Sequence, residues 1–198
     1  MPNWAWNTLE VFGTDESVRG FMADMATPVT QRVNNELTEV ETKFSLRNLV
    51  SPAAEDLEQY FTSTTDGDPK GWYDWNNENW GTKWDAQRVS TSEVTIAPNG
   101  KTTVTYTFET AWAEPVEAYK VLAAKYPHLR FDMTAEYSLG ALSRYITNDG
   151  ELILTEEHDE AESHQDYVDR GLATNCLCQS GYDEDEWFDD CPQEDEDE

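Results

Sequence analysis

Two stretches of the chain alternate between apolar and polar residues. The pattern occupies residues 101–110 (KTTVTYTFET) and residues 129–138 (LRFDMTAEYS). Successive side chains of a β-strand point to opposite faces, so each stretch is predicted to be a strand with one buried face. Pro98-Asn99-Gly100 precedes the first stretch and predicts a hairpin turn, and Asn148-Asp149-Gly150 predicts another within residues 141–157.

Two other stretches have the spacing of helices. In residues 14–26 (TDESVRGFMADMA), apolar side chains three and four positions apart form one face. Thr14 can cap the start of this helix, and Pro28 ends the segment. Residues 114–127 (EPVEAYKVLAAKYP) have a second apolar face of this kind and are predicted to form a second helix.

The remaining assignments concern shorter segments. Residues 7–13 (NTLEVFG) are predicted to form a short strand, as are residues 43–50 (KFSLRNLV), which place Phe44 and Leu46 on one face. Residues 51–61 (SPAAEDLEQYF) begin with a serine and a proline, which is typical of a helix start. Residues 28–42 are polar and are assigned to neither class.

This order of elements predicts an α+β fold. We expect a ferredoxin-like sandwich, with a mainly antiparallel sheet that carries two helices on one face, an extra hairpin and an acidic C-terminal tail. The domain is expected to span residues 1–160, with an aromatic insertion at residues 71–86. Residues 161–198 are expected to form an acidic C-terminal extension that is partly disordered.

The aromatic insertion (GWYDWNNENWGTKWDA) holds four of the chain's 8 tryptophans. Their spacings of three and four residues place rings on one side of a helical turn. They could fill the core beneath the sheet, or form a surface platform on which nucleic-acid bases stack. A platform requires cations between the rings, and only Lys70 and Lys83 flank these tryptophans. The core interpretation is therefore favoured, and Trp80 and Trp84 are expected to be largely buried.

The charge of the chain is strongly negative and unevenly distributed. There are 41 acidic and 13 basic residues, for a net charge of −28, and residues 151–198 contribute −18 of it. A protein of this charge repels nucleic acid and acidic membranes and attracts basic surfaces. Solubility or adaptation to high salt would explain the charge, and so would mimicry of a polyanion; the charge alone favours the first explanation.

Several segments resemble the Api-like protein family of phages and plasmids. They are MPNW, NTLEVFG, FSLRNLVSP, WYDWNNENWGTKWDA and YTFETAWAEPVEAYKVLAAKYPHLRF, and the resemblance covers roughly residues 1–140. NWGTKWDA and FETAWAEP are the most specific pieces. The resemblance implies a ferredoxin-like fold and an origin in a mobile element, and it transfers no catalytic residue. The polar residues 28–42 and the acidic extension depart from the family's pattern, so the features particular to this protein are expected there.

The sequence offers few candidates for metal or cofactor chemistry. The candidate metal ligands are His158, His164, Cys176, Cys178 and Cys191. Only one residue separates Cys176 from Cys178, whereas zinc sites usually have two to four residues between cysteines. We therefore predict no bound metal and no cofactor. No Gly-rich phosphate loop, EF-hand or nucleophile elbow is present, so an enzyme is not predicted.

The expected location is the cytoplasm of a host cell. No stretch approaches the roughly 20 apolar residues of a membrane span. The N-terminus has neither the basic nor the apolar region of a signal peptide. The odd number of cysteines, 3, does not suggest a secreted disulfide framework.

These observations lead to one functional hypothesis and one alternative. We expect a phage-type acidic inhibitor that mimics nucleic acid and blocks a host defence or transcription enzyme by binding its basic surface. The alternative is a non-enzymatic virion structural or assembly protein whose acidity serves solubility, and homo-oligomerisation stays open. No direct contact with nucleic acid or membrane is expected. The predicted partner-binding residues are Glu156, Glu157, Asp159, Glu160, Glu162, Asp183, Glu184, Asp185, Glu186 and Trp187.

Overall fold

The computed structural model describes residues 3–63, 67–137, 140–160 and 166. Six elements form its central unit: β1 (Trp4–Gly13), α1 (Asp15–Met25), β4 (Gln87–Thr91), β6 (Thr102–Ala111), α4 (Val116–Lys125) and β7 (Arg130–Glu136). Their strands are antiparallel and lie in the order β4-β6-β1-β7. This is the split β-α-β arrangement of a ferredoxin-like sandwich, so the predicted α+β class is confirmed.

Three further strands extend the sheet. β8 (Leu142–Asn148) pairs with β7, and β9 (Glu151–His158) pairs with β8. The short β5 (Thr95–Ile96) pairs with the start of β6. Asp149 and Gly150 join β8 to β9 with φ values of 51° and 83°, the left-handed conformation that a tight hairpin turn requires. Within the described residues, β9 is therefore one edge of the sheet.

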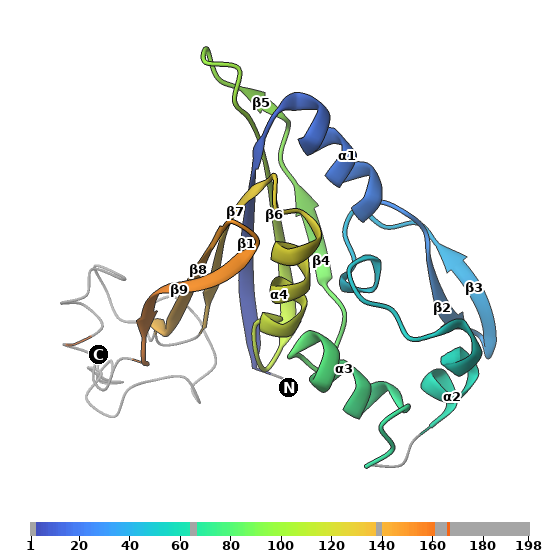
Figure 1. Ribbon diagram of the computed structural model, residues 1–198. Helices are drawn as coiled ribbons and strands as arrows, with labels where there is room; N and C mark the ends of the chain where they lie inside the picture. Colours follow the sequence, from blue (N-terminus) through green and yellow to red (C-terminus); the bar gives the residue numbers. More distant parts are fainter. Residues whose placement is uncertain (1–2, 64–66, 138–139, 161–165, 167–198) are drawn as a thin grey trace, which may run out of the picture.

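The core lies between one face of the sheet and helices α1 and α4, which cover that face together (Figure 1). The alternation along β6 and β7 buries every second side chain, as predicted. Thr14 caps α1, with its Oγ1 accepting a hydrogen bond from the Ser17 N–H at 3.2 Å. The largest core side chains from these elements are Leu9, Phe21, Met25, Tyr106, Tyr119, Leu122, Phe131 and Met133.

A long insertion separates α1 from β4. It contains β2 (Val29–Val33), β3 (Glu36–Val40), two 3₁₀ turns, η1 (Leu46–Asn48) and η2 (Ala54–Asp56), and helices α2 (Leu57–Thr62) and α3 (Trp72–Trp80). The polar residues 28–42 form the β2–β3 hairpin, a separate two-stranded sheet. Figure 1 shows the insertion at one end of the molecule and the β8–β9 hairpin at the other.

The predicted strand at residues 43–50 is wrong. Phe44, Leu46 and Leu49 are all buried, but the chain between them turns in η1 instead of extending. Asp85, 39 positions along the chain, accepts a hydrogen bond from the Leu46 N–H at 2.7 Å. The Oγ of Ser45 accepts another from the Arg47 N–H at 3.1 Å. These acceptors satisfy the backbone donors that a strand would have paired with a neighbouring strand.

No pattern in the sequence indicated strand β4. It lies at the side of the sheet opposite β9. All five of its residues are exposed or only partly buried, so it has no strong apolar alternation. Its pairing with β6 is irregular between Gln87 and Ser90. Arg88 occupies this irregularity with a φ of 49°, consistent with a local β-bulge.

Across the described residues, no helix combines the length and the apolar composition that a membrane crossing requires.

Candidate functional site

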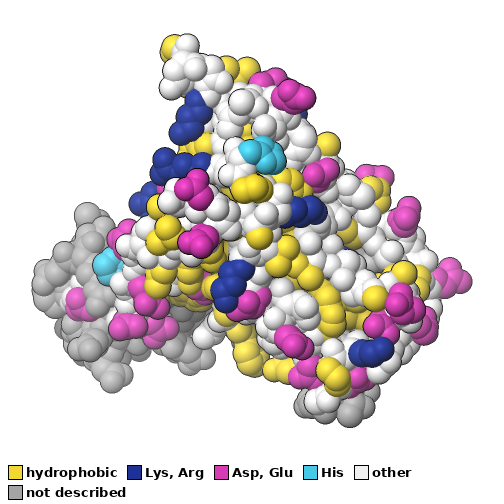
Figure 2. All heavy atoms as spheres, in the orientation of Figure 1, with side chains coloured by type: hydrophobic (Ala, Val, Ile, Leu, Met, Phe, Trp, Pro, Cys, Tyr) yellow, Lys and Arg dark blue, Asp and Glu magenta, His cyan; other side chains and the backbone are white. Residues whose placement is uncertain are grey.

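The predicted partner-binding carboxylates that the structure describes lie on or next to β9. We call Glu151, Glu156, Glu157, Asp159 and Glu160 the acidic edge; all five are exposed. Figure 2 shows acidic side chains gathered over this end of the molecule. Because β9 is an edge strand, its second hydrogen-bonding side is unpaired within the described residues.

Carboxylates of the acidic edge reach both faces of the sheet. Glu156 lies opposite Arg144 in the β8–β9 register, and Glu157 lies opposite Ser143, so the two point to opposite faces. The Arg144 guanidinium donates to both oxygens of Asp132, at 2.9 and 2.8 Å. The Oε1 of Glu156 lies 2.9 Å from the Nε2 of His158. The Arg144 guanidinium faces Glu156 but makes its two hydrogen bonds to Asp132. The side chain of Glu156 stays exposed.

Two apolar side chains interrupt the acidic edge. Ile153 and Leu154 retain 39% and 46% of their surface exposed, on opposite faces of β9. An exposed edge strand with apolar side chains is a feature that other chains can pair with. The acidic edge therefore combines negative charge, unpaired backbone groups and apolar contact area in one short segment.

The other predicted site residues, Glu162 and residues 183–187, lie outside the described residues. So do the candidate metal ligands other than His158. Within the described part of the chain, no three His, Cys, Asp or Glu side chains are grouped closely enough to hold a metal ion.

A second candidate site is a cleft formed almost entirely by the insertion. It has a volume of about 370 Å³, and we call it the insertion cleft. Its lining includes Arg47, Tyr60, Asn76, Trp80 and Asp85, which come from four different segments of the chain. No sequence pattern could have assembled these residues, because up to 38 positions separate them.

Arg47 is the centre of the insertion cleft. Its guanidinium carbon lies 5.2 Å from the ring centroid of Tyr60, 5.0 Å from that of Phe61 and 5.9 Å from that of Trp80. Nη1 donates to the carbonyl oxygen of Thr30, and Nη2 donates to the Tyr60 hydroxyl at 3.2 Å. Nε is buried and has no hydrogen-bond partner.

The carboxyl group of Asp85 lies on another wall of the insertion cleft. It accepts hydrogen bonds from the Ser45 hydroxyl at 2.5 Å and from the backbone N–H groups of Leu46 and Ala86 at 2.7 and 2.8 Å. Burial nevertheless raises the pKa of this carboxyl group, against the opposing effect of these bonds and of Arg47. The contacts of Asp85 and Arg47 tie separate segments of the insertion to one another, which gives both residues a structural role.

The aromatic insertion is only partly a core element. Trp80 is fully buried, and its Nε1–H donates to the carbonyl oxygen of Val50 at 3.0 Å, so the prediction for Trp80 is confirmed. Trp84 is only partly buried. Gly81 ends α3 with a φ of 83°, and the chain then carries Trp84 toward Trp4, whose ring centroid is 5.8 Å away.

The match to a known family agrees with this fold. Residues 79–198 match the family described as the ferredoxin-like domain in Api92-like protein. The chain belongs to this family. Among solved structures, it is similar to a protein api92 from Yersinia pseudotuberculosis, with 10% sequence identity and a TM-score of 0.49. That alignment covers 80% of this chain and 99% of the Yersinia chain. No curated protein matches the sequence.

Proposed function

We propose that this family member is an acidic inhibitor that mimics nucleic acid and blocks a nucleic-acid-binding enzyme of a host cell. The observation that carries the proposal is the acidic edge: an exposed edge strand and the residues after it, with carboxylates on both faces of the sheet. Such a segment suits a basic channel, because the channel walls would meet negative charge from either side.

The charge spacing supports this proposal over a short length. Four carboxylates occur within the five residues from Glu156 to Glu160. Five extended residues span at most about 17 Å, so this segment carries about one charge per 4 Å. One strand of DNA carries a charge every 3.4 Å or so of helix axis, and the duplex carries twice that density. The acidic edge therefore approaches the charge density of a single strand.

The distribution of charge also favours a partner over general solubility. At the end of the sheet near β5, Lys101 and Arg130 lie over the ring of Phe12, at 4.2 and 5.8 Å from its centroid. Figure 2 shows basic side chains at that end, and acidic ones over β9 and over the insertion. Adaptation to high salt would spread acids evenly along the chain, whereas residues 151–198 carry −18 of the net charge of −28.

The test is displacement of a labelled DNA duplex from host enzymes that the protein captures from a lysate. The decisive variant neutralises the acidic edge with E156Q, E157Q, D159N and E160Q. The matched control carries E36Q, E39Q, E41Q and E58Q, four exposed acids of the insertion. Both variants change the net charge equally, so only the position of the lost charge differs.

We expect the acidic-edge variant to lose affinity and the control to retain it. Four surface contacts of about 0.5 kcal/mol each correspond to a roughly thirtyfold weaker binding. The dependence of affinity on salt should become shallower for the acidic-edge variant alone. If both variants bind equally well from low to physiological salt, the acidic edge does not contribute to binding and the proposal is wrong. Capture of other virion components without any displacement of DNA would favour the assembly alternative.

A further inference from the structure

The ammonium group of Lys83 is enclosed by three aromatic rings. Its Nζ lies 5.6 Å from the ring centroid of Tyr73, 5.3 Å from that of Trp84 and 4.9 Å from that of Trp112. We call these three rings the ring cage. All three distances fall within the roughly 6 Å over which a ring face attracts a cation.

Separate segments hold the walls of the ring cage. Tyr73 lies on α3, Trp84 follows it in the chain, and Trp112 comes directly after β6. The Thr82 hydroxyl donates to the carbonyl oxygen of Ala111 at 2.9 Å, which ties the end of β6 to the chain after α3. The N–H of Trp112 donates to the carbonyl oxygen of Asn3 at 2.8 Å. The cage is therefore a product of tertiary structure and is fixed by hydrogen bonds outside it.

Core packing does not explain the position of Trp112. This residue has a φ of 77°, in the left-handed region that a bulky residue rarely occupies, and 60% of its surface is exposed. Strained backbone of this kind is concentrated at functional sites. An exposed tryptophan in an unfavourable backbone conformation gains little from burial. The contact of its ring with the Lys83 ammonium group is therefore the interaction that accounts for its position.

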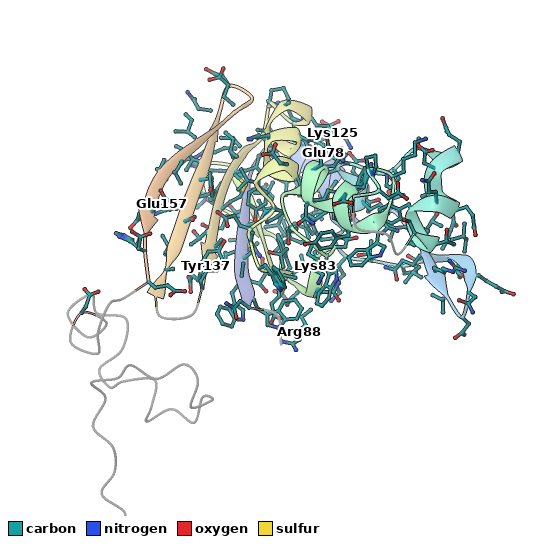
Figure 3. All side chains as sticks on the ribbon, turned by 90° about the horizontal axis from the view of Figure 1, so that it is seen from below. Glu78, Lys83, Arg88, Lys125, Tyr137 and Glu157 are labelled. Atoms are coloured by element: carbon teal, nitrogen blue, oxygen red, sulfur yellow. The ribbon has the colours of Figure 1, made fainter. Side chains whose placement is uncertain are left out.

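Lys83 itself has no carboxylate partner. In a chain with 41 acidic residues, its Nζ makes no ion pair or hydrogen bond among the described residues, and only the rings surround it. Figure 3 shows Lys83 and Arg88 close to each other, with Glu157 of the acidic edge at the opposite edge of the sheet. The cage is thus a separate site from the acidic edge.

We propose that the ring cage binds an alkylated ammonium group, which takes the place of the Lys83 ammonium. Aromatic cages are the usual means by which proteins recognise quaternary ammonium groups. Alkylation leaves the positive charge in place but removes the N–H donors that water binds, so such a group leaves water at lower cost than the Lys83 ammonium. The net charge of −28 also favours a cationic ligand.

The neighbouring residues favour a cation over nucleic acid. A platform for single-stranded nucleic acid requires a positively charged groove beside its rings. The next cation along this surface is Arg88, which lies 5.7 Å from the ring centroid of Trp4 but also binds both oxygens of Glu109, at 3.0 and 2.9 Å. Among the described residues, Lys83 is then the one cation near the cage that has no carboxylate partner. A single positive charge is too little to hold a phosphate backbone.

The experiment titrates the folded protein with tetramethylammonium chloride and follows the indole N–H signals of the tryptophans by NMR. Sodium chloride at equal concentration is the control for ionic strength. The variants are K83A, which empties the cage, and W112G, which removes one wall. Glycine accepts the φ of position 112 without strain, so W112G is expected to fold. K101A is the matched control, because Lys101 lies over the single ring of Phe12.

We expect tetramethylammonium to shift indole signals of the parent protein and of K101A with equal affinity. Even one exposed cation–π contact of typical strength would leave the cage without Lys83 only about a third to a sixth of the time, and three rings hold it here. K83A should therefore bind at least about three- to sixfold more tightly. W112G should lose the binding. If K83A is unstable by circular dichroism, K83M keeps the apolar stem of the side chain and replaces it in the test.

Two ligand sources share this chemistry, and further titrations separate them. Choline represents a small quaternary amine, and a peptide with trimethyl-lysine, compared with its unmethylated form, represents a modified protein. Tighter binding of either one supports the proposal and identifies the source. The proposal is overturned if tetramethylammonium shifts no indole signal in the parent and in K83A, or if W112G binds as the parent does. Protection of the same indoles by a single-stranded oligonucleotide, in place of the amines, would make the surface a nucleic-acid platform.

Discussion

Replacement of Trp80 by alanine is the most direct test of how the insertion is packed. The side chain of Trp80 is completely buried, and its ring meets that of Trp75 edge to face, with 5.5 Å between centroids. Arg47 lies over the same ring, and the indole N–H donates to the carbonyl oxygen of Val50. W80A therefore removes a core side chain, an aromatic contact and a hydrogen-bond donor at one position.

The expected loss of stability is large. A tryptophan-to-alanine change in a core costs about 3–5 kcal/mol. Leaving the Val50 carbonyl without its donor adds about 1 kcal/mol or more if water does not reach it. A domain is typically stable by only about 5–15 kcal/mol, so the variant is expected to be close to unfolding. At about 2–4 °C per kcal/mol for a protein of this size, the melting temperature should fall by roughly 10 °C or more.

Urea denaturation followed by circular dichroism measures the free energy of unfolding directly. W80F keeps one aromatic ring but removes the indole N–H and part of the buried ring volume, so it should lose less stability than W80A. W84A should lose less than W80A, because Trp84 is only partly buried. A free energy of unfolding for W80A within about 1 kcal/mol of the parent value would refute the core role of Trp80.

Three further predictions concern other parts of the chain. Removal of residues 181–198 should leave cooperative thermal unfolding unchanged, because a segment so rich in acids buries too little apolar surface to offset its ordering entropy; a lower melting temperature after truncation would show that the segment docks on the domain. G81A should destabilise by about 1–3 kcal/mol in urea, because Gly81 has a φ of 83° and an added Cβ would lie 3.2 Å from the backbone nitrogen of Val116; an unchanged denaturation midpoint would contradict this reasoning. Elemental analysis of protein purified without chelator should find no stoichiometric zinc, and about one zinc per chain would direct attention to His158, His164, Cys176 and Cys178.

Local sequence patterns determined the central unit of this protein except for strand β4. The alternation in β6 and β7, the capped helix α1 and the hairpin turns are set by residues within a few positions of one another. Their physics is short-ranged: the side-chain period of a strand, the side-chain cap of a helix and the left-handed residues of a turn. These elements, in this order, were sufficient to predict a ferredoxin-like α+β sandwich.

Tertiary structure decided the segments whose partners are distant in the chain. Residues 43–50 have the apolar spacing of a strand, but the Asp85 carboxylate binds Leu46 N–H and the chain turns there. Strand β4 carries almost no alternation, because it is an edge strand whose pairing with β6 is irregular. Contacts of this kind cannot be read from a local window, since the acceptor or the paired strand is supplied by another part of the fold.

The same division applies to the candidate sites. The sequence identified the acidic residues after position 150, because charge composition is visible without a fold; it could not show that several of them lie on and beside an edge strand. It also gave no sign of the ring cage, whose members are Tyr73, Trp84 and Trp112 around Lys83. Adjacent positions 83 and 84 carry a cation and a ring, but the other two walls come from α3 and from the residue after β6. Only the folding of the insertion against the end of the sheet brings these rings to one ammonium group.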